Sequence, residues 1–92
     1  MISTFKCQDT AMMFAGKRVP RFVNIETVAM RKLAMLHRAA NLSDLRIPPN
    51  NRLEALKGDR VGQCSIRIND QWRVCFRFEN GNAFDVEIVD YH

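Results

Sequence analysis

The chain has 92 residues, of which 47% are hydrophobic and 26% charged, and its formal net charge is +4. This length predicts a single domain over residues 1–92 with one thin core. The composition excludes a disordered chain. No apolar run reaches the roughly 18 residues of a membrane span. The start lacks a signal-peptide pattern, and three cysteines without paired spacing predict neither disulfides nor a structural zinc site, so we expect a cytoplasmic protein.

The start of the chain predicts a short strand followed by a short helix. Ile2–Phe5 is apolar and rich in residues that favour β structure. Asp9 is placed to cap a helix through residues 11–14, and Gly16 is placed to end it. A basic linker follows over residues 17–21.

A longer helix comes next, with Asn24 in position to cap it. Its apolar stripe has helical spacing and consists of Ile25, Val28, Ala29, Leu33, Leu36 and Ala40. Arg31, Lys32 and Arg38 fall off this stripe, so we expect them to face solvent, where a partner could still use them. His37 is expected to face solvent as well.

Residues 41–51 contain two consecutive prolines and predict a loop. From Leu53 onward the hydrophobic period changes to two, which predicts strands over residues 63–69, 72–78 and 83–90. Their apolar faces are Cys64, Ile66 and Ile68; Trp72, Val74, Phe76 and Phe78; and Phe84, Val86 and Ile88. The Asn-Asp and Asn-Gly pairs between the strands are typical of hairpins. We therefore expect an α+β fold, in which a short N-terminal strand and two helices pack on a C-terminal antiparallel meander.

Directly opposed residues of antiparallel strands share a face, so matching apolar residues sets the register. The expected pairs are Ile68 with Trp72, Ile66 with Val74, Phe78 with Phe84, and Phe76 with Val86, which leaves about three residues in each hairpin loop. On the other face, Arg67 then opposes Arg73, Arg77 opposes Asp85, and Tyr91 ends beside Arg73. Opposed like charges are destabilising, so either an anion lies between Arg67 and Arg73 or both side chains splay into water.

This register gathers cations and terminal residues at one end of the polar face. Arg67 and Arg73 come from neighbouring strands, Tyr91 and His92 from the end of the chain, and Lys57 adds a further positive charge just before the meander. Guanidinium groups bind phosphate through two parallel hydrogen bonds, and a lysine binds it less selectively. The pattern favours a phosphate site, and the basic net charge favours a polyanionic partner.

Metal-independent RNA cleavage needs a base, cations that hold the developing charge, and an acid. His92 can be acid or base near neutrality, Tyr91 can position, donate or stack on a base, and Glu54 and Asp90 can act as base or orient His92. Each residue alone also fits a structural role, and strict alternation sends His92 to the face opposite Tyr91; only their joint placement favours a site. No carboxylate or histidine cluster has ligand spacing, so we expect neither a metal nor another cofactor.

Leu56–His92 resembles the C-terminal half of HigB toxins, a branch of the RelE superfamily of bacterial toxin–antitoxin systems. The resemblance rests on Leu-Lys-Gly-Asp-Arg at 56–60, Ser65-Ile66, Asn-x-x-Trp-Arg at 69–73, the Asn-Gly turn and the final Asp-Tyr-His. It implies a compact RelE-like fold and a ribosome-dependent mRNA endoribonuclease, an mRNA interferase that blocks translation by 2′-hydroxyl attack on the phosphodiester. It also implies a HigA-type helix-turn-helix antitoxin, with operator DNA contacted only through the toxin–antitoxin complex.

Carried over by position, the resemblance makes Lys57 and Arg73 phosphate ligands, and Asp90, Tyr91 and His92 the catalytic cluster. Many relatives have a histidine two residues before the Leu-Lys-Gly run, where this chain has a carboxylate, Glu54. Arg67 is not part of the family pattern and depends on the strand argument alone. The alternative functions are a translation inhibitor that binds RNA or the ribosome without cleavage, and a basic protein-interaction module.

Overall fold

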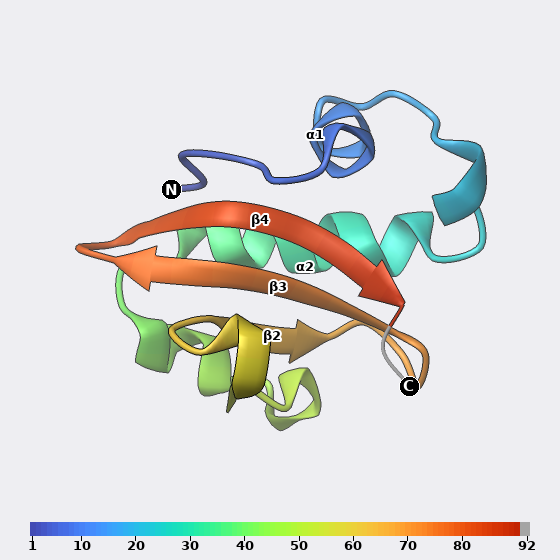
Figure 1. The fold of residues 1–92 in the computed structure, drawn as a ribbon. Coiled ribbons are helices and arrows are strands. Elements are labelled where there is room, and N and C mark those ends of the chain that lie inside the picture. Colours follow the sequence, from blue (N-terminus) through green and yellow to red (C-terminus); the bar gives the residue numbers. More distant parts are fainter. Residues whose placement is uncertain (91–92) are drawn as a thin grey trace.

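The alternating residues of the C-terminal half form a four-stranded antiparallel sheet in the computed structural model, which describes residues 1–90 (Figure 1). The strand order is β1-β2-β3-β4, with β1 at Glu54–Ala55, β2 at Cys64–Arg67, β3 at Trp72–Glu79 and β4 at Asn82–Asp90. The predicted meander is therefore confirmed, and the two-residue strand β1 extends it by one strand that the sequence pattern did not indicate.

Two α-helices pack against this sheet among the described residues: α1 spans Gln8–Phe14 and α2 spans Glu26–Arg38. Figure 1 shows α2 passing behind β3 and β4, with α1 next to β4. Short 3-10 turns connect the elements: η1 at Pro20–Phe22, η2 at Leu42–Arg46, η3 at Pro49–Asn51 and η4 at Gly58–Arg60. The largest fully buried apolar side chains between helices and sheet are Phe22, Leu33, Leu36, Leu45, Ile66, Val74, Phe76, Val86 and Ile88. Within residues 1–90, none of the helices is long and apolar enough to cross a bilayer.

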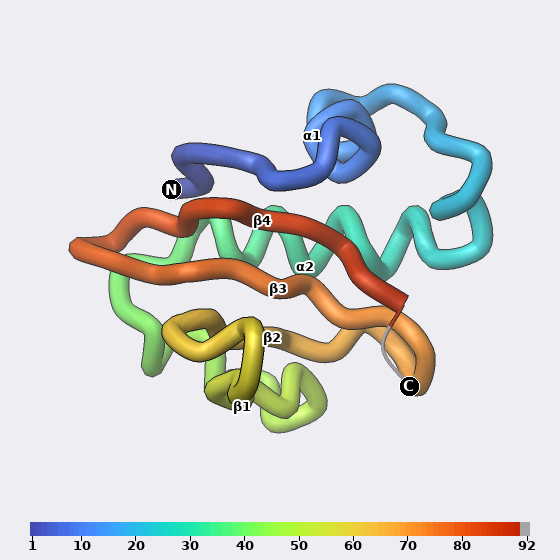
Figure 2. The backbone as a smooth tube through the Cα atoms, in the orientation of Figure 1, coloured from blue at the N-terminus to red at the C-terminus, as the bar shows by residue number. Residues whose placement is uncertain are grey.

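The first residues of the chain run beside β4, as Figure 2 shows. Ile2 and Phe5 form parallel bridges with Ala83 and Val86, supported by four backbone hydrogen bonds of 2.7–3.1 Å that include the Val86 amide to the Thr4 carbonyl. The predicted N-terminal β segment thus pairs with the sheet, as two isolated bridges at the edge of β4.

Both predicted helix caps are wrong. Asp9 lies inside the first turn of α1, whose N-cap is Cys7, and Asn24 lies one residue before Ile25, the N-cap of α2; neither cap makes a side-chain hydrogen bond. The predicted end of α1 is confirmed, because Gly16 has a φ of 93° and the turn is closed by two backbone hydrogen bonds of 3.0 Å.

The central part of the α2 stripe is confirmed, but three predictions for its neighbours are wrong. The helix ends at Arg38 and turns to extended backbone, so Ala39 is buried in place of Ala40. Lys32 is only 7% exposed. The His37 ring is half-buried, and its Nδ1 accepts a hydrogen bond from the Ile2 amide at 3.1 Å. Polar side chains of α2 thus form hydrogen bonds to other segments of the chain, which hydrophobic periodicity alone does not indicate.

The β2–β3 register is as predicted, with Ile66 opposite Val74 and the Ile68 amide bonded to the Trp72 carbonyl. The predicted β3–β4 register holds where Val74 opposes Ile88.

Beyond that point a β-bulge between Cys75 and Arg77 shifts the β3–β4 pairing by one residue. The ladder then pairs Phe78 with Ala83 and Arg77 with Phe84, so the predicted pairs Phe78–Phe84, Phe76–Val86 and Arg77–Asp85 are not formed. Asp85 takes up the extra residue with a φ of 54°. As a result Ala83 faces the core, and the hairpin loop has two residues, Asn80 and Gly81, both with positive φ.

Candidate phosphate-binding site on the sheet

The face of the sheet turned away from α2 carries the polar side chains. In the ladder, Ser65 opposes both Glu54 and Cys75, and Cys75 opposes Glu87 on the other side. Opposed residues share a face, so these side chains form one row across the four strands. In Figure 1 this face is turned toward the viewer, because α2 lies behind the sheet.

Arg73 is the most constrained side chain of this face and is only 9% exposed. Its Nε donates to Ser65 Oγ at 2.7 Å, and its Nη2 donates to the Arg52 carbonyl at 2.6 Å. The carboxylate of Glu54 lies 3.5 Å from the same Nη2. A guanidinium is planar and permanently charged, so these contacts fix a positive charge in one orientation at the end of β3.

Arg67 opposes Arg73 as predicted, but the two side chains do not both splay into water. Arg67 turns toward Asp70, with which it forms a hydrogen-bonded ion pair three residues along the chain. Arg73 is buried among its own partners. Protein groups therefore compensate both charges, so the opposition requires neither an intervening anion nor the splaying of both side chains into water.

Glu54 and Lys57 lie on the edge of the sheet next to Arg73. Glu54 belongs to β1, and its side chain is 53% exposed, so its carboxylate can be reached from solvent. Lys57 is exposed and is the N-cap residue of η4, the turn that leads from β1 to β2. The structure thus brings Glu54 to Arg73 and places Lys57 on the neighbouring turn.

An ion pair between Arg60 and Glu87 extends this face, and sequence reasoning missed it. Arg60 Nη1 lies 2.8 Å from Glu87 Oε1 and 3.2 Å from Gln63 Oε1, and Lys6 Nζ lies 3.9 Å from the same Glu87 oxygen. A signal was present: Arg60 ends the Leu-Lys-Gly-Asp-Arg motif, and the predicted register already placed Glu87 opposite Cys75.

The thiol of Cys75 lies within this ionic row and is fully buried. Burial raises the pKa of Cys75, while the charges of Arg60, Glu87, Arg73 and Glu54 shift the same pKa in opposing directions, the arginines downward and the glutamates upward. These four charged side chains therefore lie around the Cys75 thiol on β3. Burial also raises the pKa of Cys64, and all three cysteines are free thiols.

The structure separates Asp90 from Arg73. Asp90 opposes Trp72, whose ring packs edge-on against Phe22 on the helical side of the sheet at 5.6 Å. Asp90 Oδ2 accepts a hydrogen bond from Gln71 Nε2 at 3.0 Å. Asp90 therefore belongs to the opposite face of the sheet from Arg73. The predicted site residues Tyr91 and His92 lie outside the described residues, so their roles stay predictions.

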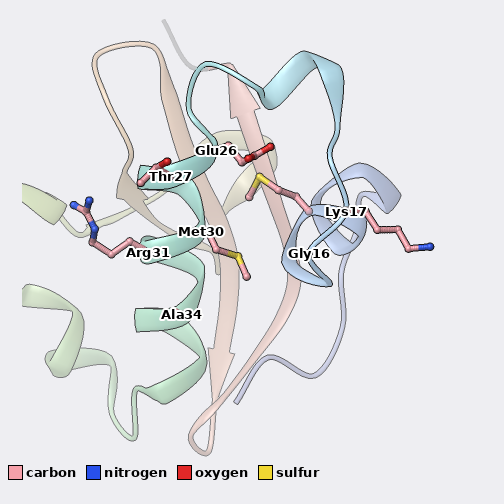
Figure 3. A pocket seen from close by; sticks show the side chains of 8 residues that line it. Gly16, Lys17, Glu26, Thr27, Met30, Arg31 and Ala34 are labelled. Carbon is pink, nitrogen blue, oxygen red and sulfur yellow. The ribbon is translucent and has the colours of Figure 1, made fainter.

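A groove of about 480 Å³ lies between α1 and α2, away from the polar face of the sheet (Figure 3). Its lining residues are Met13, Gly16, Lys17, Glu26, Thr27, Met30, Arg31 and Ala34. Figure 3 shows the side chains of Lys17 and Arg31 pointing away from it on opposite sides. Glu26 Oε2 is a buried oxygen without a hydrogen-bond partner among residues 1–90. Of the predicted site residues that the structure describes, none lines this groove.

The geometry of the sheet face suits an anionic ligand whose reaction involves proton transfer. Arg73 presents a fixed positive charge, Lys57 offers a mobile one nearby, and the exposed carboxylate of Glu54 can accept a proton within 3.5 Å of the guanidinium.

Comparisons with known proteins identify the family of this chain. The family model of HigB, described as a RelE-like toxin of type II toxin–antitoxin systems, matches residues 15–92. The chain is 48% identical over 62 residues to Toxin HigB-1 of Vibrio cholerae serotype O1, covering 67% of this chain and 65% of that protein. It is 46% identical over 41 residues to Endoribonuclease HigB of Proteus vulgaris, covering 45% of each. The matched stretches therefore span less than two thirds of either relative.

A solved structure has a similar fold. The crystal structure of YafQ from E. coli strain BL21(DE3) superposes with a TM-score of 0.52 over 98% of this chain and 91% of that chain, at 10% identity. At this identity the similarity concerns the fold alone. Together with the family match, it confirms the predicted RelE-like α+β fold.

Proposed function

This chain belongs to the HigB family of RelE-like toxins of type II toxin–antitoxin systems, and from that membership we propose that it is a toxin that cleaves messenger RNA on the ribosome. The observation that carries the proposal is the fixed guanidinium of Arg73 with the Glu54 carboxylate 3.5 Å away, on the open face of the sheet. The relative from Proteus vulgaris bears the name of an endoribonuclease, which supports the same activity.

The reaction is a metal-independent transesterification. The 2′-hydroxyl of a ribose attacks the adjacent phosphorus, the bond to the 5′-oxygen breaks, and a 2′,3′-cyclic phosphate is formed. A base removes the 2′-hydroxyl proton, and an acid protonates the departing 5′-oxygen. Positive charges stabilise the non-bridging oxygens while negative charge develops on them.

The described residues supply two of these parts. Arg73, held by Ser65 and the Arg52 carbonyl, stabilises the phosphorane charge, and Lys57 binds the same phosphate from the neighbouring turn. Glu54 is the base, because its exposed carboxylate lies next to the guanidinium that binds the phosphate.

The remaining roles fall to the end of the chain and to β2. His92 protonates the leaving group, Tyr91 positions the substrate by stacking on a base, and Asp90 orients His92. Arg67 contacts a neighbouring phosphate, since its ion-pair partner among residues 1–90 is Asp70, whose carboxylate is exposed and can give way to the ligand.

The partners follow from the family and from the charge. A net charge of +4 favours association with ribosome-bound message, a polyanion. A HigA-type helix-turn-helix antitoxin neutralises the protein, operator DNA is reached only through that complex, and the reaction takes place in the cytoplasm.

The test is cleavage of message in a reconstituted translation reaction, with new RNA 5′ ends mapped by primer extension. Glu54→Gln and His92→Ala should each reduce cleavage by about 10²- to 10⁴-fold, the usual contribution of an acid or base. Glu79→Gln is the matched control, because Glu79 is an exposed glutamate in an ion pair at the opposite end of β3. Cleavage by both site variants at the wild-type rate would refute the proposal.

The substitution of a carboxylate for the usual histidine at Glu54 favours one second candidate, an inhibitor that occupies the ribosome without cutting. Such a protein would stop translation and yield no new RNA ends, and its inhibition would survive Glu54→Gln. A basic protein-interaction module would neither stop translation nor produce ends.

A further inference from the structure

Lys32 and Asn51 form a buried polar contact that the proposed reaction does not use. Lys32 is 7% exposed and Asn51 is fully buried. The Lys32 ammonium donates to Asn51 Oδ1 at 2.6 Å. Asn51 Nδ2 donates to the Leu45 carbonyl at 3.1 Å and contacts Met35 Sδ at 3.0 Å. The Lys32–Asn51 contact therefore ties α2 to η2 and η3 from inside the molecule.

Stability alone does not account for a lysine in this place. Burial lowers the pKa of Lys32, and the positive charges of Arg31 and Arg67 lower it further. Well-packed apolar residues of similar volume often replace buried charged groups with no loss of stability or with a gain.

The contact leads directly to the candidate site. Asn51 is the last residue of η3, and the next residue, Arg52, has left-handed backbone angles of φ 46° and ψ 55°. A non-glycine residue keeps such a conformation only where its surroundings hold it. The Arg52 carbonyl accepts the 2.6 Å hydrogen bond from Arg73 Nη2. An unbroken series of contacts thus connects Lys32 on α2 with the guanidinium on β3.

We propose that Lys32 and Asn51 are positioning residues, which fix the peptide of Arg52 and through its carbonyl set the orientation of the Arg73 guanidinium. The consequence for cleavage rests on the proposed function; the effect on Arg73 does not. Misplacement of a charge-stabilising group by an ångström reduces a reaction rate by up to about 100-fold.

The first test observes Arg73 itself in the double variant Lys32→Met/Asn51→Leu, which replaces the contact by apolar side chains. Hydrogen exchange of the Arg73 Nε–H, followed by NMR, should accelerate about tenfold or more, the change expected when a hydrogen bond of a charged group weakens. The melting temperature should stay within a few degrees of wild type. Should the double variant fail to fold, the single variant Lys32→Met is measured instead. Unchanged exchange would overturn the proposal.

His37→Leu is the matched control. It removes another polar tie of α2, the hydrogen bond from the Ile2 amide, at the end of the molecule where Ile2 bridges Ala83. Exchange of the Arg73 Nε–H should keep its wild-type rate in this variant. Equal acceleration in both variants would show a general loosening of α2 and would contradict a specific link to Arg73.

The second test is a double-mutant cycle on cleavage with Arg73→Lys. If Lys32 and Asn51 act through Arg73, their replacement should reduce cleavage by about 10- to 100-fold in the wild-type background and have little further effect in the Arg73→Lys background. Independent, multiplying losses would overturn the positioning role. If wild type produces no RNA ends, the proposed function fails, while the exchange measurement still decides the link to Arg73.

Discussion

Replacement of Ser65 by alanine tests whether Arg73 is held as the structure indicates. Ser65 is fully buried, and its Oγ accepts the Nε–H of Arg73 at 2.7 Å. The substitution removes one oxygen atom and leaves a charged donor without that partner at a site shielded from water. The backbone contact from Arg73 Nη2 to the Ser65 carbonyl, at 3.4 Å, does not depend on the serine side chain.

The expected loss can be estimated from this geometry. A hydrogen bond to a charged group contributes about 1.5–3 kcal/mol, and a buried donor left unpaired costs a similar amount, so we expect the free energy of unfolding to fall by about 2 kcal/mol. For a domain of this length each kcal/mol corresponds to about 4–8 °C, so the melting temperature should fall by about 8–16 °C.

The assay is urea denaturation and thermal melting of purified Ser65→Ala protein, with Glu79→Gln as control. Glu79 forms an exposed ion pair with Arg77, and its loss should change stability by no more than about 0.5 kcal/mol. If Ser65→Ala also changes stability by less than about 0.5 kcal/mol, the Nε–H of Arg73 is not bound to Ser65, and the account of a fixed guanidinium is wrong.

Two further predictions concern Lys32 and the β3–β4 turn. The pKa of Lys32 is lowered in the folded state, so between that lowered pKa and 10.5 the unfolded chain binds more protons than the folded chain. The free energy of unfolding of the wild type should therefore increase relative to Lys32→Met as the pH rises toward 10.5. If urea denaturation gives the same stability difference at pH 7 and pH 10, the burial of a charged ammonium is contradicted. Gly81→Ala should lower the melting temperature more than Gly62→Ala does. Both glycines have positive φ, but only at Gly81 would a new Cβ lie 3.3 Å from a neighbouring atom, the Ala40 carbonyl oxygen. Equal decreases in melting temperature would rule out this close approach.

The meander was predictable because one face of each strand is buried, which makes the apolar period visible and fixes the register over Ile66–Val74 and Val74–Ile88. The bulge was not predictable, because an aspartate such as Asp85 gives no signal that it will adopt a positive φ. Since the alternation shifts there by one residue, Ala83 and Phe84 exchange faces relative to the prediction.

The candidate site was predictable in part. Alternation placed Arg67 opposite Arg73 and gave the common face of the polar row, which includes Ser65 and Glu54, but one partner of each arginine comes from outside the paired strands. Asp70 lies in a turn, and the Arg52 carbonyl lies after η3, 21 residues before Arg73. Lys32 is buried because it binds Asn51, which lies 19 residues away, so the hydrophobic periodicity of the helix does not predict this burial.

The pairing of the first residues with β4 has a consequence for the order in which the protein folds. Backbone hydrogen bonds join Met1 to Gly81 and Ala83, and Thr4 to Val86, across about eighty positions of sequence. A nascent chain that ends before β4 lacks the partner of both its own N-terminal segment and β3. The polar row therefore needs β4, which supplies Glu87, and contacts of such long range make for slow folding. The face that Glu87 shares with Arg73 is thus expected to form late in folding, when β4 docks between β3 and the first residues.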